Sequence, residues 1–269
     1  AVVNFDDLEL RWYDHLLKRI DNGIENEKPV RIFVMGIDKW REENNWPLAR
    51  AKSTEYYLHS GGKANLLTGD GSLSTAAPKS EPSDRYVYDP GNPVPTLGGP
   101  LCCDATHLMP GPVDQRPDEA RPDVLVYTTP AFKQDFEVTG PVKLVLYASS
   151  SAVDTDFTGK LVDVWPNGFA QNLTEGILRA RYRDSQVTPE LMNPGQIYKF
   201  TIDLWSTSNV FKAGHKLRLE ISSSNFPRFD RNPNTGASPE TATRWVKATN
   251  MIYHDSAHPS GLVLPVVPR

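Results

Sequence analysis

The chain opens with apolar residues spaced as on one face of a helix. Within residues 4–22 they recur every three or four positions: Phe5, Leu8, Trp12, Leu16 and Ile20. Asn4 is placed to cap the start of this helix, and Gly23 is placed to end it. Residues 30–36, VRIFVMG, form a near-continuous apolar run, which is typical of a strand buried on both faces of a parallel sheet. A helix followed by such a strand is typical of an α/β fold, but one such unit is too small to stand alone.

After Trp46 and Pro47 the pattern changes to short β-like runs. They cover residues 56–59, 86–88, 124–127, 142–149, 160–165, 176–182, 197–205, 215–222, 251–254 and 262–267. In one run the alternate residues Tyr198, Phe200, Ile202 and Leu204 share a face. In another, Leu217, Leu219 and Ile221 face away from Arg218, Glu220 and Ser222. A period of two indicates half-buried strands, most often antiparallel.

Turn signals rich in Pro, Asn and Gly separate these runs, as in Asn193-Pro194-Gly195. About ten short strands with such punctuation predict a mainly β fold, a β-sandwich or jelly roll. Residues 68–122 are rich in Gly, Pro, Ser and Asp and are long for a loop. We therefore expect this segment to wrap over another surface of the protein.

Composition narrows the classes of function. The 269 residues carry a net charge of −4, and the basic residues are never clustered, so nothing indicates a nucleic-acid partner. Apolar runs stay well short of the roughly 18 residues that a membrane helix needs. The first ten residues show no signal peptide. Cys102 and Cys103 are adjacent, and we expect reduced thiols, which fit a cytoplasmic protein.

The sequence offers little sign of a catalytic motif. The G-x-S-x-G frame of an α/β-hydrolase is absent. His254, Asp255 and Ser256 are consecutive, and side chains of neighbours do not converge as a triad does. His254 and His258 lack a convincing third metal ligand, so we expect a surface or core histidine rather than a metal site. We predict no catalytic residue, no metal site and no cofactor in this chain.

Two polar segments leave alternatives open. Asp154, Asp156 and Asp163 are close enough in sequence to hold calcium, but they lack the spacing of a calcium loop, and turn-capping carboxylates are the alternative. Residues 221–236, ISSSNFPRFDRNPNTG, carry either the side chains of an active site or those of a loop that satisfies its own backbone.

Long segments resemble a known family. They are VRIFVMGIDKWREENNWPL, GPVDQRPDEARPDVLVYTTP, SAVDTDFTGKLVDVWPNG, GILRARYRDS, SNVFKAGHKLRLEISSSNFPRFDRNPNTG and HPSGLVLPVVP. In this order they resemble the C-terminal half of the cocaine esterase and X-prolyl dipeptidyl peptidase family of serine hydrolases. The resemblance implies an α/β-hydrolase remnant at 1–46. It also implies a jelly roll with a galactose-binding-like fold at 47–269, which includes the wrapping segment 68–122.

In that family the serine, acid and histidine of the triad lie upstream of the helix with which this chain begins, so none carries over. The resemblance implies a non-catalytic part of an ester or X-prolyl peptide hydrolase that stabilises the catalytic domain and shapes its pocket. It leads to the hypothesis that Leu101, Cys102 and Cys103 line the acyl or leaving-group side of that pocket, and a plain buried turn is the alternative. It also makes 221–236 a structural loop, in which a pairing of Asp230 with Arg228 or Arg231 would be structural.

The partners follow from the same resemblance. The apolar helix and strand at the start predict an exposed patch that binds the upstream α/β-hydrolase domain, a separate N-terminal fragment or a second copy of the chain. A free-standing carbohydrate-binding jelly roll is the alternative, because six tryptophans are available and exposed aromatic rings stack on sugars. Coplanar exposed aromatics on one sheet face would favour that alternative.

Overall fold

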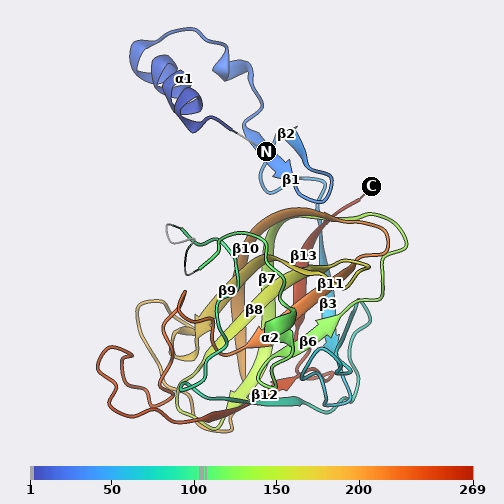
Figure 1. Ribbon diagram of the computed structural model, residues 1–269, viewed down its shortest axis with the longest axis vertical. Helices are drawn as coiled ribbons and strands as arrows, with labels where there is room; N and C mark the ends of the chain where they lie inside the picture. The colour runs from blue at the N-terminus through green and yellow to red at the C-terminus, as the bar shows by residue number, and fades with distance from the viewer. Residues whose placement is uncertain (1–2, 103–105, 107, 269) are drawn as a thin grey trace.

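The computed structural model describes residues 3–102, 106 and 108–268. It begins with helix α1 (Phe5–Lys18), which stands apart from the β-rich body (Figure 1). Asn4 occupies the capping position, but its amide donates to the Asp7 carboxylate at 2.6 Å. The helix ends at Arg19, which has a left-handed φ of 56°, and the predicted end at Gly23 is wrong. Gly23 instead precedes the 3₁₀ helix η1 (Ile24–Asn26).

Strands β1 (Val30–Val34) and β2 (Lys39–Glu43) form a separate antiparallel hairpin. The expected parallel strand, buried on both faces, is wrong for the residues that the structure describes. The chain reverses at Gly36 and Asp38, both at positive φ, and so β2 returns along β1. The end of β1 does touch the large sheet, where the N–H and carbonyl of Met35 bond to β10 at 3.0 and 2.9 Å.

Eleven strands make up the body. They are β3 (Lys52–His59), β4 (Ser72–Ser74), β5 (Asp84–Tyr88), β6 (Leu125–Thr128), β7 (Phe136–Ser150), β8 (Asp156–Val164), β9 (Ala170–Arg179), β10 (Tyr198–Phe211), β11 (Lys216–Ser222), β12 (Ala248–Tyr253) and β13 (Gly261–Val267). Two short helices, α2 (Arg116–Glu119) and η2 (Ala180–Tyr182), complete the described elements. The mainly β prediction is therefore confirmed.

The strands pair in the order β5-β12-β7-β13-β3-β4-β6-β11-β8-β9, and β10 also pairs with β7. Among the named strands of the described residues, β4 and β6 pair in parallel and the other pairs are antiparallel. The sheet folds over on itself as in a β-sandwich (Figure 1). Leu144 of β7 and Leu204 of β10 meet Gly159 of β8, where an added Cβ would lie 2.8 Å from Leu144. This close packing places the core between the two layers.

The predicted alternation of buried and exposed residues holds in β10 and fails in β11. In β10, Phe200, Ile202 and Leu204 are buried while the residues between them are exposed, as the pattern predicted. In β11, Arg218 and Glu220 are buried as well, so the half-buried expectation is wrong there. Strand β11 lies between β6 and β8, and side chains of α2 contact its polar face.

The described residues of the segment 68–122 form three regular elements, β4, β5 and α2. Strand β5 pairs with β12, and a carboxylate of α2 binds the buried arginine of β11. This segment therefore contributes to the body and brings polar side chains to β11. Among the described residues, no helix is long and apolar enough to cross a membrane.

Candidate functional site

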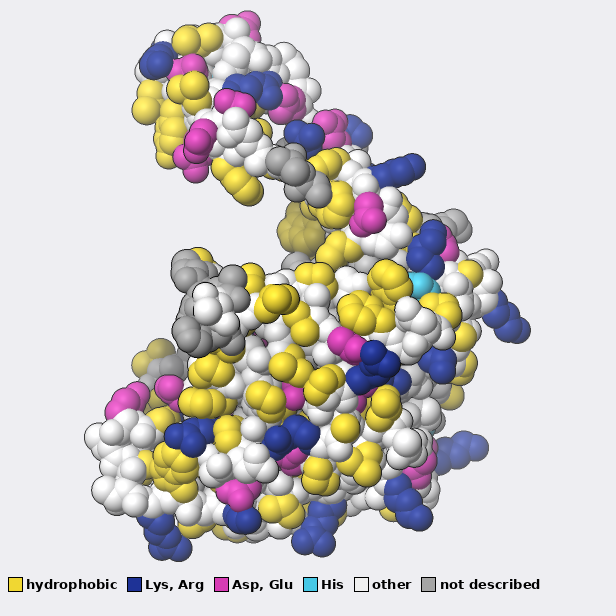
Figure 2. Space-filling view, in the orientation of Figure 1, with side chains coloured by type: hydrophobic (Ala, Val, Ile, Leu, Met, Phe, Trp, Pro, Cys, Tyr) yellow, Lys and Arg dark blue, Asp and Glu magenta, His cyan; other side chains and the backbone are white. Residues whose placement is uncertain are grey.

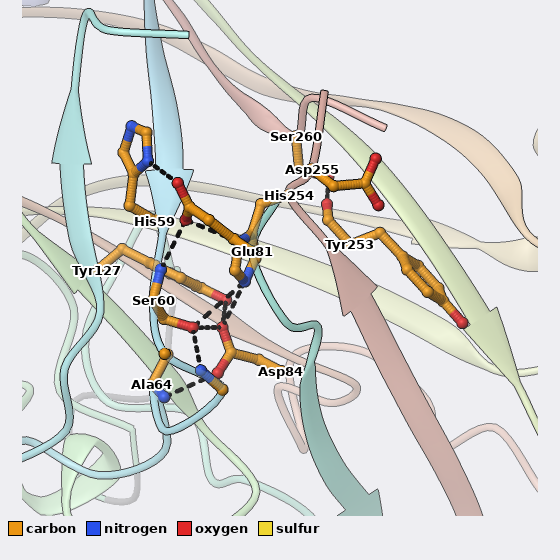
Figure 3. A network of polar contacts seen from close by, with 12 residues as sticks. His59, Ser60, Ala64, Glu81, Asp84, Tyr127, Tyr253, His254, Asp255 and Ser260 are labelled. Carbon is orange, nitrogen blue, oxygen red and sulfur yellow. Dashed lines mark hydrogen bonds and ion pairs between the residues drawn. The ribbon is translucent and has the colours of Figure 1, made fainter. Parts of the chain in front are cut away.

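A serine, a histidine and an aspartate do meet in the interior, although not the three that are consecutive in the sequence (Figure 3). Ser60 follows β3, Asp84 begins β5 and His254 follows β12. Asp84 Oδ2 accepts hydrogen bonds from Ser60 Oγ at 2.6 Å and Tyr127 OH at 2.7 Å. The same oxygen lies 2.9 Å from Nε2 of His254. Asp84 and His254 are fully buried.

The arrangement differs from a catalytic triad in one decisive respect. A triad places its serine and its carboxylate on opposite nitrogens of the histidine ring. Here Ser60 Oγ and Asp84 Oδ2 both face Nε2 of His254, at 3.3 and 2.9 Å, and the serine proton points to the aspartate. The other nitrogen, Nδ1, lies 3.4 Å from Glu81. The histidine is thus enclosed by carboxylates and has no lone pair directed at the serine.

Electrostatics agree with this geometry. Burial lowers the pKa of His254, but the hydrogen bond and charge of Asp84, together with the charge of Glu81, outweigh it and the net pKa is raised. Burial raises the pKa of Asp84, yet the hydrogen bonds from His254, Ser60, Ala64 and Tyr127 lower it overall. The pair therefore favours imidazolium and carboxylate, which makes it an internal ion pair that joins β3, β5, β6 and the end of β12.

The consecutive trio 254–256 does not converge. Asp255 bonds to His258 at 3.2 Å, and Ser256 donates its backbone N–H to Lys79 at 2.8 Å. His254 is a core residue and His258 lies near the surface.

The three aspartates proposed as calcium ligands each have protein partners. Arg181 donates to Asp154 at 2.7 Å, and Arg179 donates to Asp156 at 3.0 Å. Asn232 bridges the two carboxylates at 2.8 Å to each. Asp163 instead pairs with a histidine of the β10–β11 turn at 2.8 Å. These contacts leave no common centre for a cation, and no group of three metal-ligating side chains occurs in the described part of the chain.

A second buried cluster lies where α2 meets β8 and β11, and the sequence reading missed it. Lys160 Nζ donates to Gln115 Oε1 at 2.5 Å and lies 3.5 Å from Asp118 and 3.6 Å from Glu220. Burial raises the pKa of Glu220 to about 8 and the pKa of Asp118 to about 6. The charged positions 160, 218 and 220 inside two apolar strands were the available signal.

The polar stretch 221–236 is structural. Ser222 contacts Thr158 at 2.6 Å, and Ser223 contacts Tyr86 at 2.8 Å. Ser224 accepts the backbone N–H of Val94 at 2.8 Å. All three serines are buried, so none presents an exposed hydroxyl to a substrate.

The two arginines of this stretch bind residues outside it. Arg228 forms its ion pair with Glu175 of β9. Arg231 donates to the Pro90 carbonyl at 3.2 Å and stacks on Trp245, with 3.9 Å from its guanidinium carbon to the ring centre. Both arginines therefore bind other segments of the chain rather than their neighbour.

The expected pocket residues lie after the turn at 98–99. Leu101 is half-buried and Cys102 is exposed, while Cys103 lies outside the described residues. Cys102 takes part in a disulfide bond, so the expectation of reduced thiols is wrong for it and no longer supports a cytoplasmic location.

Beside this turn runs a groove of about 400 Å³, which Gly99 and Pro100 share with Met35, Leu173 and Trp205. Trp205 has a φ of 65° and is 69% exposed, because β10 bulges there. This tryptophan therefore lies on the surface rather than in the core.

Two other exposed tryptophans contact neighbouring side chains of their own. Trp165 packs against Phe169 and His215, and Trp245 lies over an arginine. In the described part of the chain, the ring contacts of Trp40 and Trp165 are with Phe and His rings rather than with a second tryptophan, and they give no support to the carbohydrate-binding alternative.

Comparisons with known proteins show which family this chain is similar to. A profile described as the X-Pro dipeptidyl-peptidase C-terminal non-catalytic domain matches residues 22–263. Cocaine esterase of Rhodococcus sp. (strain MB1 Bresler) is 47% identical over 96% of this chain and 45% of its own length.

Two solved structures are similar over nearly the whole chain. An α-amino acid ester hydrolase is 30% identical with a TM-score of 0.82, over 95% of this chain and 44% of its own. An aminopeptidase from the marine sediment archaeon Thaumarchaeota archaeon is 28% identical with a TM-score of 0.81, over 98% of this chain and 44% of its own. The chain thus spans less than half the length of these relatives.

Proposed function

Because the chain belongs to the family of X-Pro dipeptidyl-peptidase C-terminal non-catalytic domains, we propose that it is the C-terminal part of a serine hydrolase that cleaves esters or X-prolyl peptides. The serine, histidine and acid would lie in an α/β-hydrolase domain upstream, and residues 1–46 would complete that domain. The single observation that carries the proposal is the family match over residues 22–263. The jelly-roll, galactose-binding-like topology of residues 47–269 belongs to the same proposal.

The first role that we assign to the chain is to stabilise the catalytic domain. Helix α1 buries none of its residues, and its apolar side chains lie on the surface (Figure 2). With η1 and the β1–β2 hairpin it lines a hollow of about 690 Å³, and the walls of this hollow include Phe5, Trp12, Ile24 and Trp40. Apolar surface of this kind marks an interaction site in a soluble protein. The upstream domain is its occupant in this proposal, because the relatives extend well beyond this chain.

The second role is to shape the substrate pocket. Leu101 and Cys102, together with Cys103, would line the acyl or leaving-group side of the upstream active site. Their turn adjoins the Trp205 groove, and Met35 at the end of β1 lies in the same groove. Met35 of the proposed hydrolase remnant and Pro100, which precedes the proposed pocket residues, thus line one groove, which supports the assignment.

Labelling of the full-length protein with a fluorophosphonate probe tests the catalytic assignment. We expect one adduct, on a serine upstream of residue 5, since the serines of the 222–224 run are buried and Ser60 is bonded to Asp84. Peptide mapping by mass spectrometry locates the adduct. An adduct on any serine within residues 4–268 would overturn the proposal.

A separate test addresses the pocket. Leu101→Trp in the full-length enzyme should alter the preference between small and bulky acyl groups by about tenfold, because one wall of the pocket would carry a larger side chain. Unchanged preference would remove the pocket-shaping role and leave the family assignment untouched.

A further inference from the structure

The turn before Leu101 is built on two consecutive glycines. Gly98 and Gly99 have φ of +68° and +95°, a region that glycine alone adopts without strain. Gly99 also exchanges two backbone hydrogen bonds with Gly111, of 2.8 and 2.9 Å. One edge of the turn is therefore fixed by backbone pairing.

Beneath the turn lies the ion pair between Glu175 and Arg228. The Glu175 side chain is 4% exposed and that of Arg228 is 16% exposed. An added Cβ on Gly99 would lie 2.8 Å from Oε1 of Glu175 and 3.3 Å from Nη1 of Arg228. The backbone at residue 99 thus rests directly on the ion pair, with no space for a side chain.

Arg228 also holds this segment through its backbone. Its N–H donates to Oγ1 of Thr96 at 3.1 Å. The Thr96 N–H donates to the Phe226 carbonyl at 2.7 Å, and the Phe226 N–H donates to the Val94 carbonyl at 3.0 Å. The two segments therefore run side by side as a short parallel pair.

A third contact fixes the same segment from the other side. Gln115 is fully buried, and its Nε2 donates to the Leu97 carbonyl at 3.0 Å. Its Oε1 accepts from Lys160 at 2.5 Å. The buried charge cluster under α2 is thereby connected to the residue that precedes the glycine turn.

We propose that Glu175 and Arg228 are positioning residues for the substrate pocket. Their ion pair fixes the position of the 98–99 turn, and hence how far the Leu101 side chain extends toward the substrate. This inference rests on the proposed function, because it requires Leu101 to face the substrate. A carboxylate and a guanidinium form a directional, charge-assisted contact, which holds one geometry better than apolar packing does. A displacement of about 1 Å at a pocket wall is enough to change rates strongly.

The test uses the full-length enzyme and p-nitrophenyl esters with acetyl, butyryl and benzoyl groups. Gly99→Ala pushes a methyl group against Glu175, and Arg228→Lys keeps the charge but removes the planar fork. Gly195→Ala is the matched control, since Gly195 has a similar φ of +81° and no atom within 4 Å of an added Cβ. The readout is the ratio of kcat/KM for the bulky and the small ester.

We expect Gly99→Ala and Arg228→Lys each to change this ratio by about tenfold, while Gly195→Ala leaves it unchanged. Glu175→Gln, which keeps the shape of the side chain, should change the ratio less than Glu175→Ala. Melting temperatures identify any variant that fails to fold, and Arg228→Lys preserves the test if Gly99→Ala unfolds.

Two outcomes overturn the inference and differ in what else they imply. If the positioning variants leave the ratio unchanged while Leu101→Trp alters it, the positioning role is wrong and the proposed pocket remains. If Leu101→Trp also leaves the ratio unchanged, the pocket role fails and the positioning role fails with it.

Discussion

Asp84 is the acceptor at the centre of the buried network, so its replacement tests whether that network is structural. Asp84→Asn keeps the size of the side chain and removes its charge. The carboxylate accepts hydrogen bonds from Ser60, Tyr127, His254 and the backbone of Ala64. An amide group would present two donors to partners that are themselves donors, and it would leave the histidine without its closest counter-charge.

The expected loss of stability in Asp84→Asn follows from the burial of Asp84 and His254. Breaking a buried ion pair by removing one partner costs about 3–5 kcal/mol, because the remaining charge is left uncompensated. Both Asp84 and His254 are fully buried, so the full range applies. At about 2–4 °C for each kcal/mol in a domain of this size, we expect the melting temperature to fall by about 10 °C. Thermal unfolding followed by circular dichroism at pH 6 measures this change.

The pH dependence has a definite sign. The pKa of His254 is raised in the folded protein, so its stabilisation is complete below its ordinary value of 6.5 and is lost as pH rises through the raised pKa. The pKa of Asp84 is lowered, so its stabilisation is present above 3.8 and is lost as pH falls through the lowered pKa. The difference between Asp84→Asn and the unmodified protein should therefore be largest between pH 3.8 and 6.5.

Asp255→Asn serves as the control, because Asp255 is about one-third exposed and its ion pair with His258 lies near the surface. Such pairs contribute at most about 1 kcal/mol, so this variant should unfold close to the unmodified protein. If Asp84→Asn were no less stable than Asp255→Asn at pH 6, the structural interpretation of the network would be refuted.

Three further predictions concern other parts of the fold. Gly36→Ala should destabilise the protein by more than about 1 kcal/mol in urea unfolding, because the added Cβ would lie 2.1 Å from a β10 carbonyl oxygen. Gly23→Ala is the control, since Gly23 has a similar φ and no atom within 4 Å of an added Cβ. An equal loss of stability in Gly23→Ala would contradict the steric reason. Glu220→Gln should raise the melting temperature at pH 9 and leave it unchanged at pH 4. Burial raises the pKa of Glu220 to about 8, so the native state favours the uncharged form of this side chain. A lower melting temperature of the variant at pH 9 would show that the carboxylate is needed. The double variant Leu8→Glu and Trp12→Glu should reduce self-association of the isolated chain in sedimentation velocity, and unchanged sedimentation would rule out α1 as the adhesive surface.

Local patterns predicted those parts of the fold that depend on neighbours in sequence. The alternation of Phe200, Ile202 and Leu204 correctly marked one buried face of β10, because successive side chains of a strand point to opposite sides. The helical stripe correctly located α1, although it could not show that the stripe has no partner within the described residues. The ordered motifs pointed to the family, which the profile match over residues 22–263 confirms.

Pairings between distant residues escaped the sequence reading. Asp84 and His254 are 170 positions apart, and Arg218 and Glu119 are 99 positions apart. No periodicity relates such residues, so the buried ion pairs could not be anticipated. Arg228 likewise pairs with Glu175 of β9, which is distant in the sequence.

The sequence by itself determined the strand content, the apolar N-terminal helix and the absence of the G-x-S-x-G frame, because each of these follows from residue type and short-range spacing. Only the tertiary structure decided which charges are paired and which polar faces are buried. Strand β11 shows the reason: its alternating pattern is that of a half-exposed strand, yet its neighbours in the sheet and α2 cover the polar face. Burial depends on what the rest of the chain brings to a surface, and that information is not contained in the local pattern.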